Sequence, residues 1–172
     1  MDILLIHDPD NHFQEAMDGA YRALSELRSQ GVVKAIGAGM NQWEMEARLA
    51  REGDFDCFLL AGRYTLLDHQ ALPEFLPLCQ EKNISVIIGG PYNSGILASD
   101  LTESATFNYV AAQPEVLDRA RRCKDVCDRH GVPLKAAALQ FVFGHPAVTA
   151  AIPGPGSAAE AEDNFQMMAH SI

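Results

Sequence analysis

The chain has 172 residues, a formal net charge of −10 and 48% apolar residues. These values are typical of a single globular domain with a sizeable core. No apolar run approaches the roughly 20 residues that cross a bilayer, and the N-terminus lacks the basic region of a signal peptide. Basic residues are scattered, so no basic face for nucleic acid is apparent. We expect one domain over 1–172, soluble and cytoplasmic, without membrane or nucleic-acid partners.

The four cysteines do not predict a metal site. Cys57 and Cys79 lie in apolar stretches and are expected to be buried. Cys123 and Cys127 are four residues apart on an expected helix, and only His130 is close to them. Structural zinc usually takes four ligands, so we expect no bound metal.

From the N-terminus, short apolar runs alternate with longer amphipathic ones. The first third of the chain predicts strands over 3–6, 32–37 and 56–62, separated by helices over 12–30 and 41–52. Gly31 is placed to end the first helix. Asn41 is a candidate N-cap of the second helix.

The rest of the chain continues the alternation with one interruption. It predicts a helix over 70–82, a strand over 84–90, a long loop over 91–112 and a helix over 114–130. Pro133 opens a further helix, and a last strand covers 148–154. Ser157 is expected to cap a short final helix that runs toward Asn164.

This order of elements predicts an α/β fold with parallel strands covered by helices. Two architectures fit the pattern: an open doubly wound sheet and a closed eightfold barrel. The pattern shows five strands, whereas a barrel has eight strands and typically about 250 residues. Periodicity alone does not choose between them.

Five segments in register resemble aldo-keto reductases, most closely the subgroup of aldose and fucose 1-dehydrogenases and pyridoxal 4-dehydrogenase. They are LLIHDPD, GVVKAIGAGMNQ, FDCFLLAGRYTLL, ISVIIGGPYNSGIL and AAIPGPGSAAEAEDN. The resemblance implies a (β/α)8 TIM-barrel fold of which the chain carries the C-terminal portion, strands 4 to 8. It also implies an NAD(P)-linked oxidoreductase that passes a hydride between a nicotinamide and a sugar lactol or small aldehyde, ketone or alcohol.

His7 is the candidate catalytic residue. It ends the first predicted strand, and the chemistry of barrel enzymes lies at the C-terminal ends of strands. An imidazole there can hydrogen-bond a substrate oxygen, although a polar residue that merely opens a loop also fits. The resemblance implies the family's substrate-orienting histidine. The family's catalytic tyrosine, lysine and aspartate have no match, because the tyrosines of this chain occupy other positions.

Three loops are implied to bind the cofactor. The loop after the second strand offers Asn41 to the nicotinamide carboxamide, although a helix cap explains Asn41 equally well. The next segment, GGPYNSGIL, matches a main-chain wrap around the pyrophosphate; its candidate residues are Gly90, Pro91, Tyr92 and Gly95. A plain Gly-Pro turn is the alternative for it.

The third loop, IPGPGSAAEAEDN, matches the adenosine-binding turn and the helix after it. Its candidate residues are Gly154, Ser157, Glu160 and Asn164. Gly154, Gly156 and Glu160 stand where relatives that bind a 2′-phosphate carry basic residues, so NAD(H) is favoured over NADP(H). Glu160 is also a favourable acid in a first helical turn.

Two functions remain open. One is the oxidoreductase, acting on a small carbonyl or sugar substrate. The other is a truncated, catalytically incompetent half-barrel that at most binds nucleotide. Edge strands left open in such a half-barrel predict a homo-oligomer that pairs through them.

Overall fold

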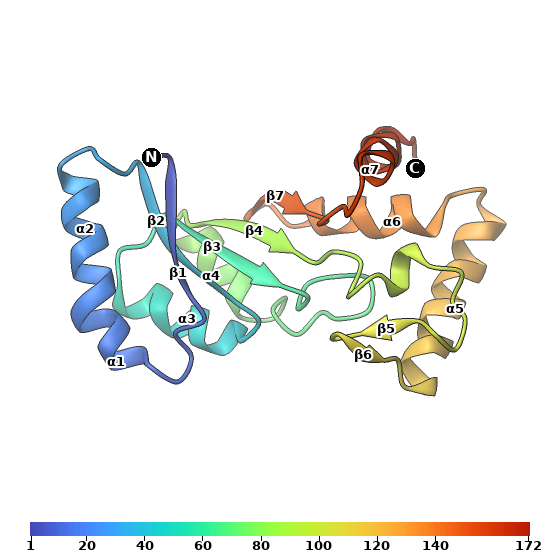
Figure 1. Cartoon of the computed structure of the whole chain (residues 1–172), viewed down its shortest axis with the longest axis horizontal. Helices are drawn as coiled ribbons and strands as arrows, with labels where there is room; N and C mark the ends of the chain where they lie inside the picture. Colours follow the sequence, from blue (N-terminus) through green and yellow to red (C-terminus); the bar gives the residue numbers. More distant parts are fainter.

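The computed structural model describes all 172 residues and contains one five-stranded parallel sheet. Its strands lie side by side in chain order (Figure 1): β1 (Ile3–His7), β2 (Ala35–Met40), β3 (Cys57–Ala61), β4 (Ser85–Gly89) and β7 (Val148–Ile152). Every neighbouring pair is parallel. The predicted parallel α/β fold is therefore confirmed, and β1 and β7 are the open edges of the sheet.

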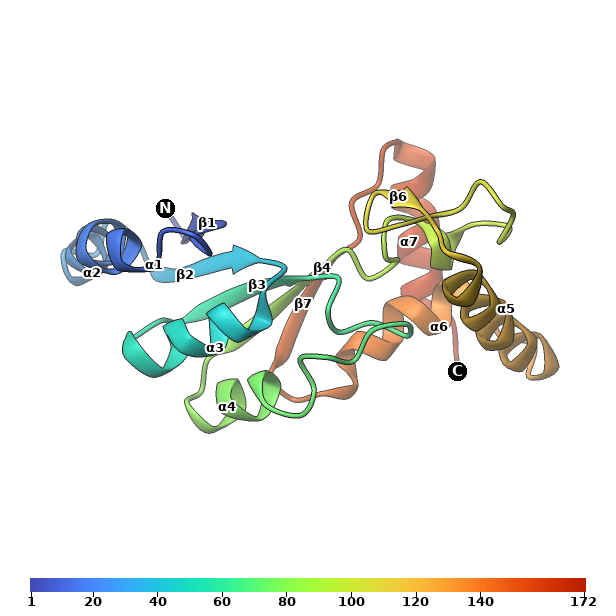
Figure 2. The same cartoon turned by 90° about the horizontal axis from the view of Figure 1, so that it is seen from below.

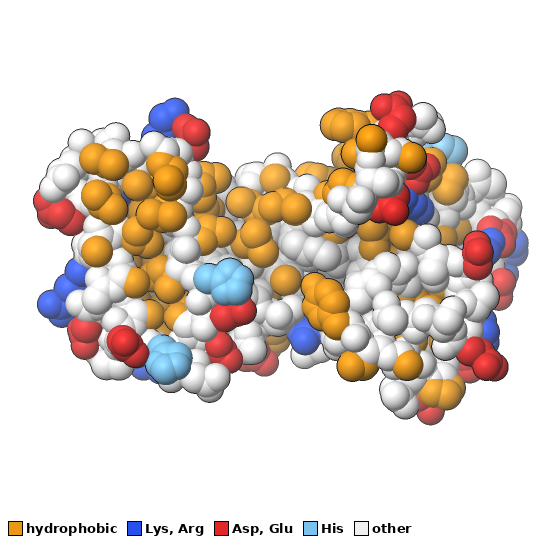
Figure 3. Space-filling view, in the orientation of Figure 1, with side chains coloured by type: hydrophobic (Ala, Val, Ile, Leu, Met, Phe, Trp, Pro, Cys, Tyr) orange, Lys and Arg blue, Asp and Glu red, His pale blue; other side chains and the backbone are white.

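The N-terminal helices pack against the sheet and build the main core. They are α1 (Phe13–Glu15), the π-helical segment η1 (Ala16–Tyr21), α2 (Arg22–Ser29), α3 (Trp43–Glu52) and α4 (Phe75–Glu81). Figure 2 shows α3 and α4 on one side of the sheet. The strand residues that contribute to this core are fully buried, among them Ile36, Phe58, Leu60, Val86 and Ile88. Hydrophobic side chains over β1 and its neighbours remain visible in Figure 3.

A second group of elements lies beyond the carboxyl ends of β4 and β7 (Figure 1). Its helices are η2 (Ile96–Ala98), α5 (Pro114–Arg129), α6 (Leu134–Phe141) and α7 (Ala158–Ala169), whereas η3 (Val142–Gly144) leads into β7 and adds Val142 to the main core. Apolar residues of η2, α5 and α6 form a second buried cluster. None of the helices in the chain combines the length and apolar character that crossing a membrane requires.

The segment 91–112 is more ordered than the long loop that the sequence predicts. Besides η2, it contains a small hairpin of β5 (Thr106–Phe107) and β6 (Val110–Ala111). Asn108 and Tyr109 form its turn, and both have positive φ angles, 52° and 64°. Such a turn favours Asn-Gly, so a tyrosine at the second position concealed the hairpin.

Several boundaries also differ from the prediction. The second strand covers Ala35–Met40 rather than 32–37. Glycines weaken strand propensity, but Gly37 is required there, because a Cβ on it would lie 1.9 Å from the Cys57 carbonyl oxygen. The helix expected from residue 70 begins at Phe75, and the final helix extends to Ala169.

Candidate functional site

A cleft of about 550 Å³ opens between the loop after β4 and the turn that joins β7 to α7. Small-molecule sites commonly have about 300–1,000 Å³. In parallel α/β folds, ligands bind at the carboxyl ends of the strands, and this cleft occupies that position. Its lining residues are Gly90, Tyr92, Ser94, Gly95, Ala98, Tyr109, Lys135, Ile152, Pro153, Gly154, Pro155, Glu160 and Asn164.

One wall of the cleft is a turn with left-handed backbone. Three successive residues have positive φ: Asn93 (47°), Ser94 (59°) and Gly95 (95°). Free main-chain amides in turns can bind anions, but the amides of Asn93 and Gly95 already donate to the carbonyl oxygens of Gly90 (2.9 Å) and Tyr92 (3.1 Å). The Ser94 amide donates no hydrogen bond within the chain. A Cβ added at Gly90 or Gly95 would meet no atom within 4 Å, so there is room for a ligand beside this main chain.

The opposite wall is the start of α7. Ser157 is its N-cap, as predicted: its Oγ accepts a 3.2 Å hydrogen bond from the Glu160 amide. The Glu160 carboxylate in turn accepts a 2.7 Å bond from the Gly156 amide. This reciprocal capping fixes the first turn of α7. Amides at a helix N-terminus attract anions, and Gly154 (φ 68°) brings the chain into the turn.

Tyr92 joins the two walls. Its hydroxyl donates a 2.9 Å hydrogen bond to Asn164 Oδ1, and both side chains are buried. Burial, reinforced by the negative charge of Asp163, raises the pKa of Tyr92 to about 12. The phenol is therefore protonated at neutral pH and remains a hydrogen-bond donor.

Lys135 also lines the cleft, although none of the sequence motifs includes it. Its ammonium forms an ion pair with Asp163 and lies 5.4 Å from the centre of the Tyr92 ring. The available signal was a single lysine in the apolar helix LKAAALQF. A charge at that position suggests that one part of the helix faces a polar space.

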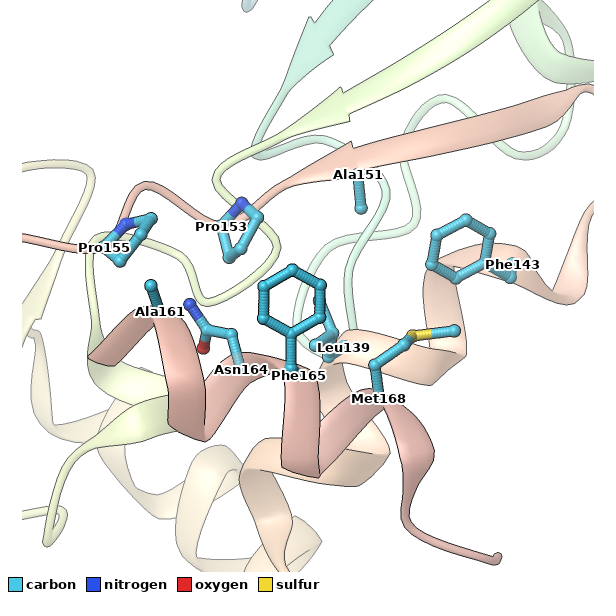
Figure 4. A pocket seen from close by; sticks show the side chains of 9 residues that line it. All are labelled: Leu139, Phe143, Ala151, Pro153, Pro155, Ala161, Asn164, Phe165 and Met168. Atoms are coloured by element: carbon cyan, nitrogen blue, oxygen red, sulfur yellow. The ribbon is translucent and has the colours of Figure 1, made fainter. Parts of the chain in front are cut away.

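The cleft thus brings together six predicted residues, namely Gly90, Tyr92, Gly95, Gly154, Glu160 and Asn164. Pro91 is buried beside it and Ser157 is exposed at the helix start, and neither lines the cleft. A smaller apolar cavity of about 310 Å³ adjoins it and shares Asn164 (Figure 4). Apolar side chains from α6, η3, β7 and α7 surround that cavity.

Asn41 lies outside the cleft, just beyond the end of β2. Its Nδ2 donates a 2.8 Å hydrogen bond to the carbonyl oxygen of Ala61, at the end of β3. The expectation that Asn41 caps the following helix was wrong, because α3 begins at Trp43 and its N-cap is Gln42. The structure therefore uses the Asn41 amide to join two strand ends.

His7 lies on the opposite edge of the sheet from the cleft. It is the last residue of β1, and its side chain is 90% exposed. Its Nδ1 is 3.3 Å from Asp8 Oδ2, and both residues border a shallow depression with His12 and Glu15. The structure does not place His7 together with the cleft residues.

The parallel sheet, its covering helices and a cleft at the carboxyl ends of the strands define part of a (β/α)8-barrel protein. The family model described as Aldo/keto reductase family matches residues 1–172. The chain belongs to the aldo/keto reductase family.

Individual relatives show how much of such a protein the chain represents. It is 39% identical to pyridoxal 4-dehydrogenase from Microbacterium luteolum and 37% identical to D-threo-aldose 1-dehydrogenase from a Pseudomonas species. Each match covers 100% of this chain and 53% of the relative. The chain therefore spans about half the length of these curated relatives and matches their C-terminal region.

Solved structures agree on the fold. An aldo-keto reductase from Bacillus halodurans, in its apo form, has a TM-score of 0.77 and 21% sequence identity. The match covers 99% of this chain and 57% of that protein. The holo form of the same reductase also gives a TM-score of 0.77. The five-stranded sheet thus corresponds to strands 4 to 8 of a barrel, as the resemblance implies.

Proposed function

We propose that the cleft binds NAD(H) and that the chain is the cofactor-binding part of an oxidoreductase for sugar lactols or small aldehydes, ketones and alcohols. One observation carries the proposal: a left-handed turn and a helix N-terminus face each other across a single cleft. Both features suit phosphate groups. The names of the two dehydrogenase relatives support the substrate class.

The residues of the cleft divide the nucleotide between them. The free Ser94 amide binds the pyrophosphate, Gly90 and Gly95 leave space for it beside the main chain, and Gly154 and the first turn of α7 take the ribose. Asn164 reads the adenine edge with the side-chain amine that Tyr92 leaves free. Pro91 and Ser157 act indirectly, by shaping the turn and the helix start. When bound, the nicotinamide supplies the hydride chemistry.

NAD(H) is the expected form of the cofactor. Glu160 lines the cleft at the start of α7, where a carboxylate repels a 2′-phosphate and accepts a hydrogen bond from a 2′-hydroxyl. The one lysine of the cleft does not reverse this preference, because Asp163 offsets the charge of Lys135.

Titration with NADH and NADPH, followed by nucleotide fluorescence, tests the proposal. We expect NADH to bind about tenfold more tightly, a difference of about 1.4 kcal/mol. Glu160→Arg should narrow the difference in affinity between NADH and NADPH. Glu162→Arg makes the same charge change at an exposed site on α7 outside the cleft and leaves this difference unchanged. Equal or tighter binding of NADPH by the wild type contradicts the preference, and failure to bind either nucleotide contradicts the function.

His7 and Asn41 are assigned to the substrate and to the nicotinamide ring of the cofactor, respectively. His7 hydrogen-bonds the substrate oxygen, and the exposed imidazole is accessible for this. Asn41 offers its Oδ1 to the nicotinamide carboxamide, since only its Nδ2 is engaged by the protein.

A second candidate function is nucleotide binding without turnover. Two tyrosines, Tyr64 and Tyr92, are buried, and their pKa values are raised by burial. The phenols of Tyr64 and Tyr92 are therefore poorly suited to donate a proton near neutral pH. Turnover of a lactol with NAD⁺ supports the oxidoreductase, and tight NADH binding without turnover supports the second function.

A further inference from the structure

Two buried polar residues, Thr65 and Asn93, support the left-handed turn that forms one wall of the cleft. Thr65, in the loop after β3, is 0% exposed, and Asn93, in the turn itself, is 3% exposed. The Thr65 hydroxyl donates a 2.5 Å hydrogen bond to Asn93 Oδ1. Asn93 Nδ2 donates a 3.2 Å bond to the carbonyl oxygen of Gly62. Neither side chain lines the cleft.

The surrounding donors and acceptors leave this pair one arrangement. Thr65 Oγ1 already accepts hydrogen bonds from the amides of Leu67 (3.2 Å) and Asp68 (3.1 Å). The hydroxyl hydrogen of Thr65 is therefore free to be donated to Asn93, and Asn93 must present its Oδ1 to accept it. The amine of Asn93 then faces the Gly62 carbonyl, which can only accept. The hydrogen-bonding requirements of both loops thus fix the amide orientation.

The pair holds a backbone conformation that non-glycine residues adopt only with strain. Asn93 and Ser94 both have positive φ, which the surrounding contacts must maintain. Asn93 ties the turn to the loop after β3. Ser94 ties it to the hairpin, since its carbonyl accepts a 2.7 Å bond from Thr106 Oγ1 and its Oγ a 3.0 Å bond from the Tyr109 amide. The free amide of Ser94 is held between these two anchors.

We propose that Thr65 and Asn93 are positioning residues for the pyrophosphate of the bound nucleotide. Their hydrogen bonds keep the free main-chain amide of Ser94 aligned before the ligand arrives, so that binding does not have to order the turn. The inference rests on the proposed function. It adds that affinity for phosphate-bearing ligands depends on two residues that do not touch the ligand.

Isosteric variants of Thr65 test the inference in the full chain. Thr65→Val preserves the shape and removes the hydroxyl, whereas Thr65→Ser keeps the hydroxyl. Each variant is titrated with ADP, which carries the pyrophosphate, and with adenosine, which does not. We expect Thr65→Val to weaken ADP and NADH binding about tenfold, to leave adenosine binding within about twofold and to be rescued by Thr65→Ser. A purely structural role would weaken the two ligands alike.

Asn93→Gly provides a second route if Thr65→Val folds poorly. Glycine adopts the positive φ without strain, so this variant removes the clamp and leaves the turn accessible. It should also weaken ADP selectively. Unchanged ADP affinity in both variants, with wild-type binding intact, overturns the positioning role alone. A wild-type chain that binds neither ADP nor NADH overturns the proposed function and this inference together.

Discussion

The hydroxyl of Tyr92 donates a 2.9 Å hydrogen bond to Asn164 Oδ1, joining residues 72 positions apart in the chain. One belongs to the turn after β4 and the other to α7. Their contact sets the distance between the two walls of the cleft. Stability and nucleotide affinity should therefore both depend on this bond.

Tyr92→Phe removes the bond and little else. Asn164 is buried, and a buried acceptor that loses its donor costs about 1–3 kcal/mol. We expect the free energy of unfolding in urea to fall by that amount and NADH to bind more weakly. Tyr109→Phe is the matched control, because Tyr109 is 86% exposed and its variant should unfold like the wild type. Equal stability of both variants would show that the bond contributes nothing.

The raised pKa of Tyr92 gives an alkaline signature. Its folded value, about 12, exceeds the ordinary value of 10.0. The protonated phenol is favoured in the folded state, so this contribution to stability is complete below pH 10 and is lost as pH rises through about 12. Titration of tyrosinate absorbance should show one fewer late-ionising phenol in Tyr92→Phe. Tyr64, whose pKa burial also raises, should persist as a late phenol in that variant.

Glu46 predicts a pH dependence of a different origin. Its side chain is fully buried on α3, and neither carboxylate oxygen has a hydrogen-bond partner. Desolvation raises its pKa well above 4.5, and the nearby Met40 amide offsets only part of this effect. The contribution to stability is complete below about pH 4.5 and declines as pH rises through the folded pKa.

Glu46→Met removes this unsatisfied group with little change of volume. We expect a gain of about 1–3 kcal/mol near neutral pH and a smaller gain in acid, measured by urea unfolding at a series of pH values. Glu44→Met, at an exposed position on the same helix, should change stability little at any pH. A constant gain across the series would mean that the pKa of Glu46 is the same in the folded and the unfolded chain, which contradicts the proposed desolvation.

His7→Ala separates the role in the reaction from a role in folding. The side chain is 90% exposed, so stability should change by less than about 0.5 kcal/mol. Affinity for NADH should also remain, because His7 is remote from the cleft. In any preparation that turns over a lactol, kcat should fall markedly, while His12→Ala, at another exposed position, leaves it unchanged. Weaker NADH binding with normal kcat would contradict the proposed role.

Local sequence signals were sufficient for the five strands of the sheet and the main helices, but not for η2, the β5–β6 hairpin or every boundary. Buried apolar runs such as CFLLA and SVIIG identify parallel strands by composition alone. Gly39 shows the limit of such signals, because it lies beyond the predicted end of its strand at residue 37, and its place in the strand follows from contact with Leu59 of β3. That contact depends on the neighbouring strand, which a local pattern does not contain.

The cleft was predictable only where a family motif covers it. Gly90 and Asn164 belong to such motifs. Lys135, by contrast, joins the cleft through Asp163, 28 residues away, and Thr65 meets Asn93 across the same separation in the chain. Contacts such as these form because the fold brings the segments that follow successive strands to one edge of the sheet. They can therefore be recognised only once the fold is known.

The open edges of the sheet lead to a prediction about association. Both β1 and β7 lack a neighbour on one side, and edge strands of this kind promote pairing between chains. Large apolar side chains are exposed on or near these edges: Ile3 (45%), Ile152 (49%), Phe165 (75%) and Met168 (42%). Phe165 and Met168 also border the apolar cavity beside α7 (Figure 4). Several exposed apolar groups around one cavity are typical of an interaction surface.

We therefore expect the 172-residue chain, produced alone, to self-associate in solution. Burial of apolar surface contributes about 25 cal/mol per Å². A charge at Phe165, beside the apolar cavity, should therefore weaken association strongly. Sedimentation velocity should show a species larger than one chain for the wild type and a shift toward the monomer for Phe165→Glu. Val126→Glu introduces the same charge at a residue of α5 that is 48% exposed and does not border the cavity, so it should sediment like the wild type. A wild-type chain that remains a stable monomer at all accessible concentrations would contradict this expectation. It would show that water satisfies the unpaired backbone groups of β1 and β7 without a second chain.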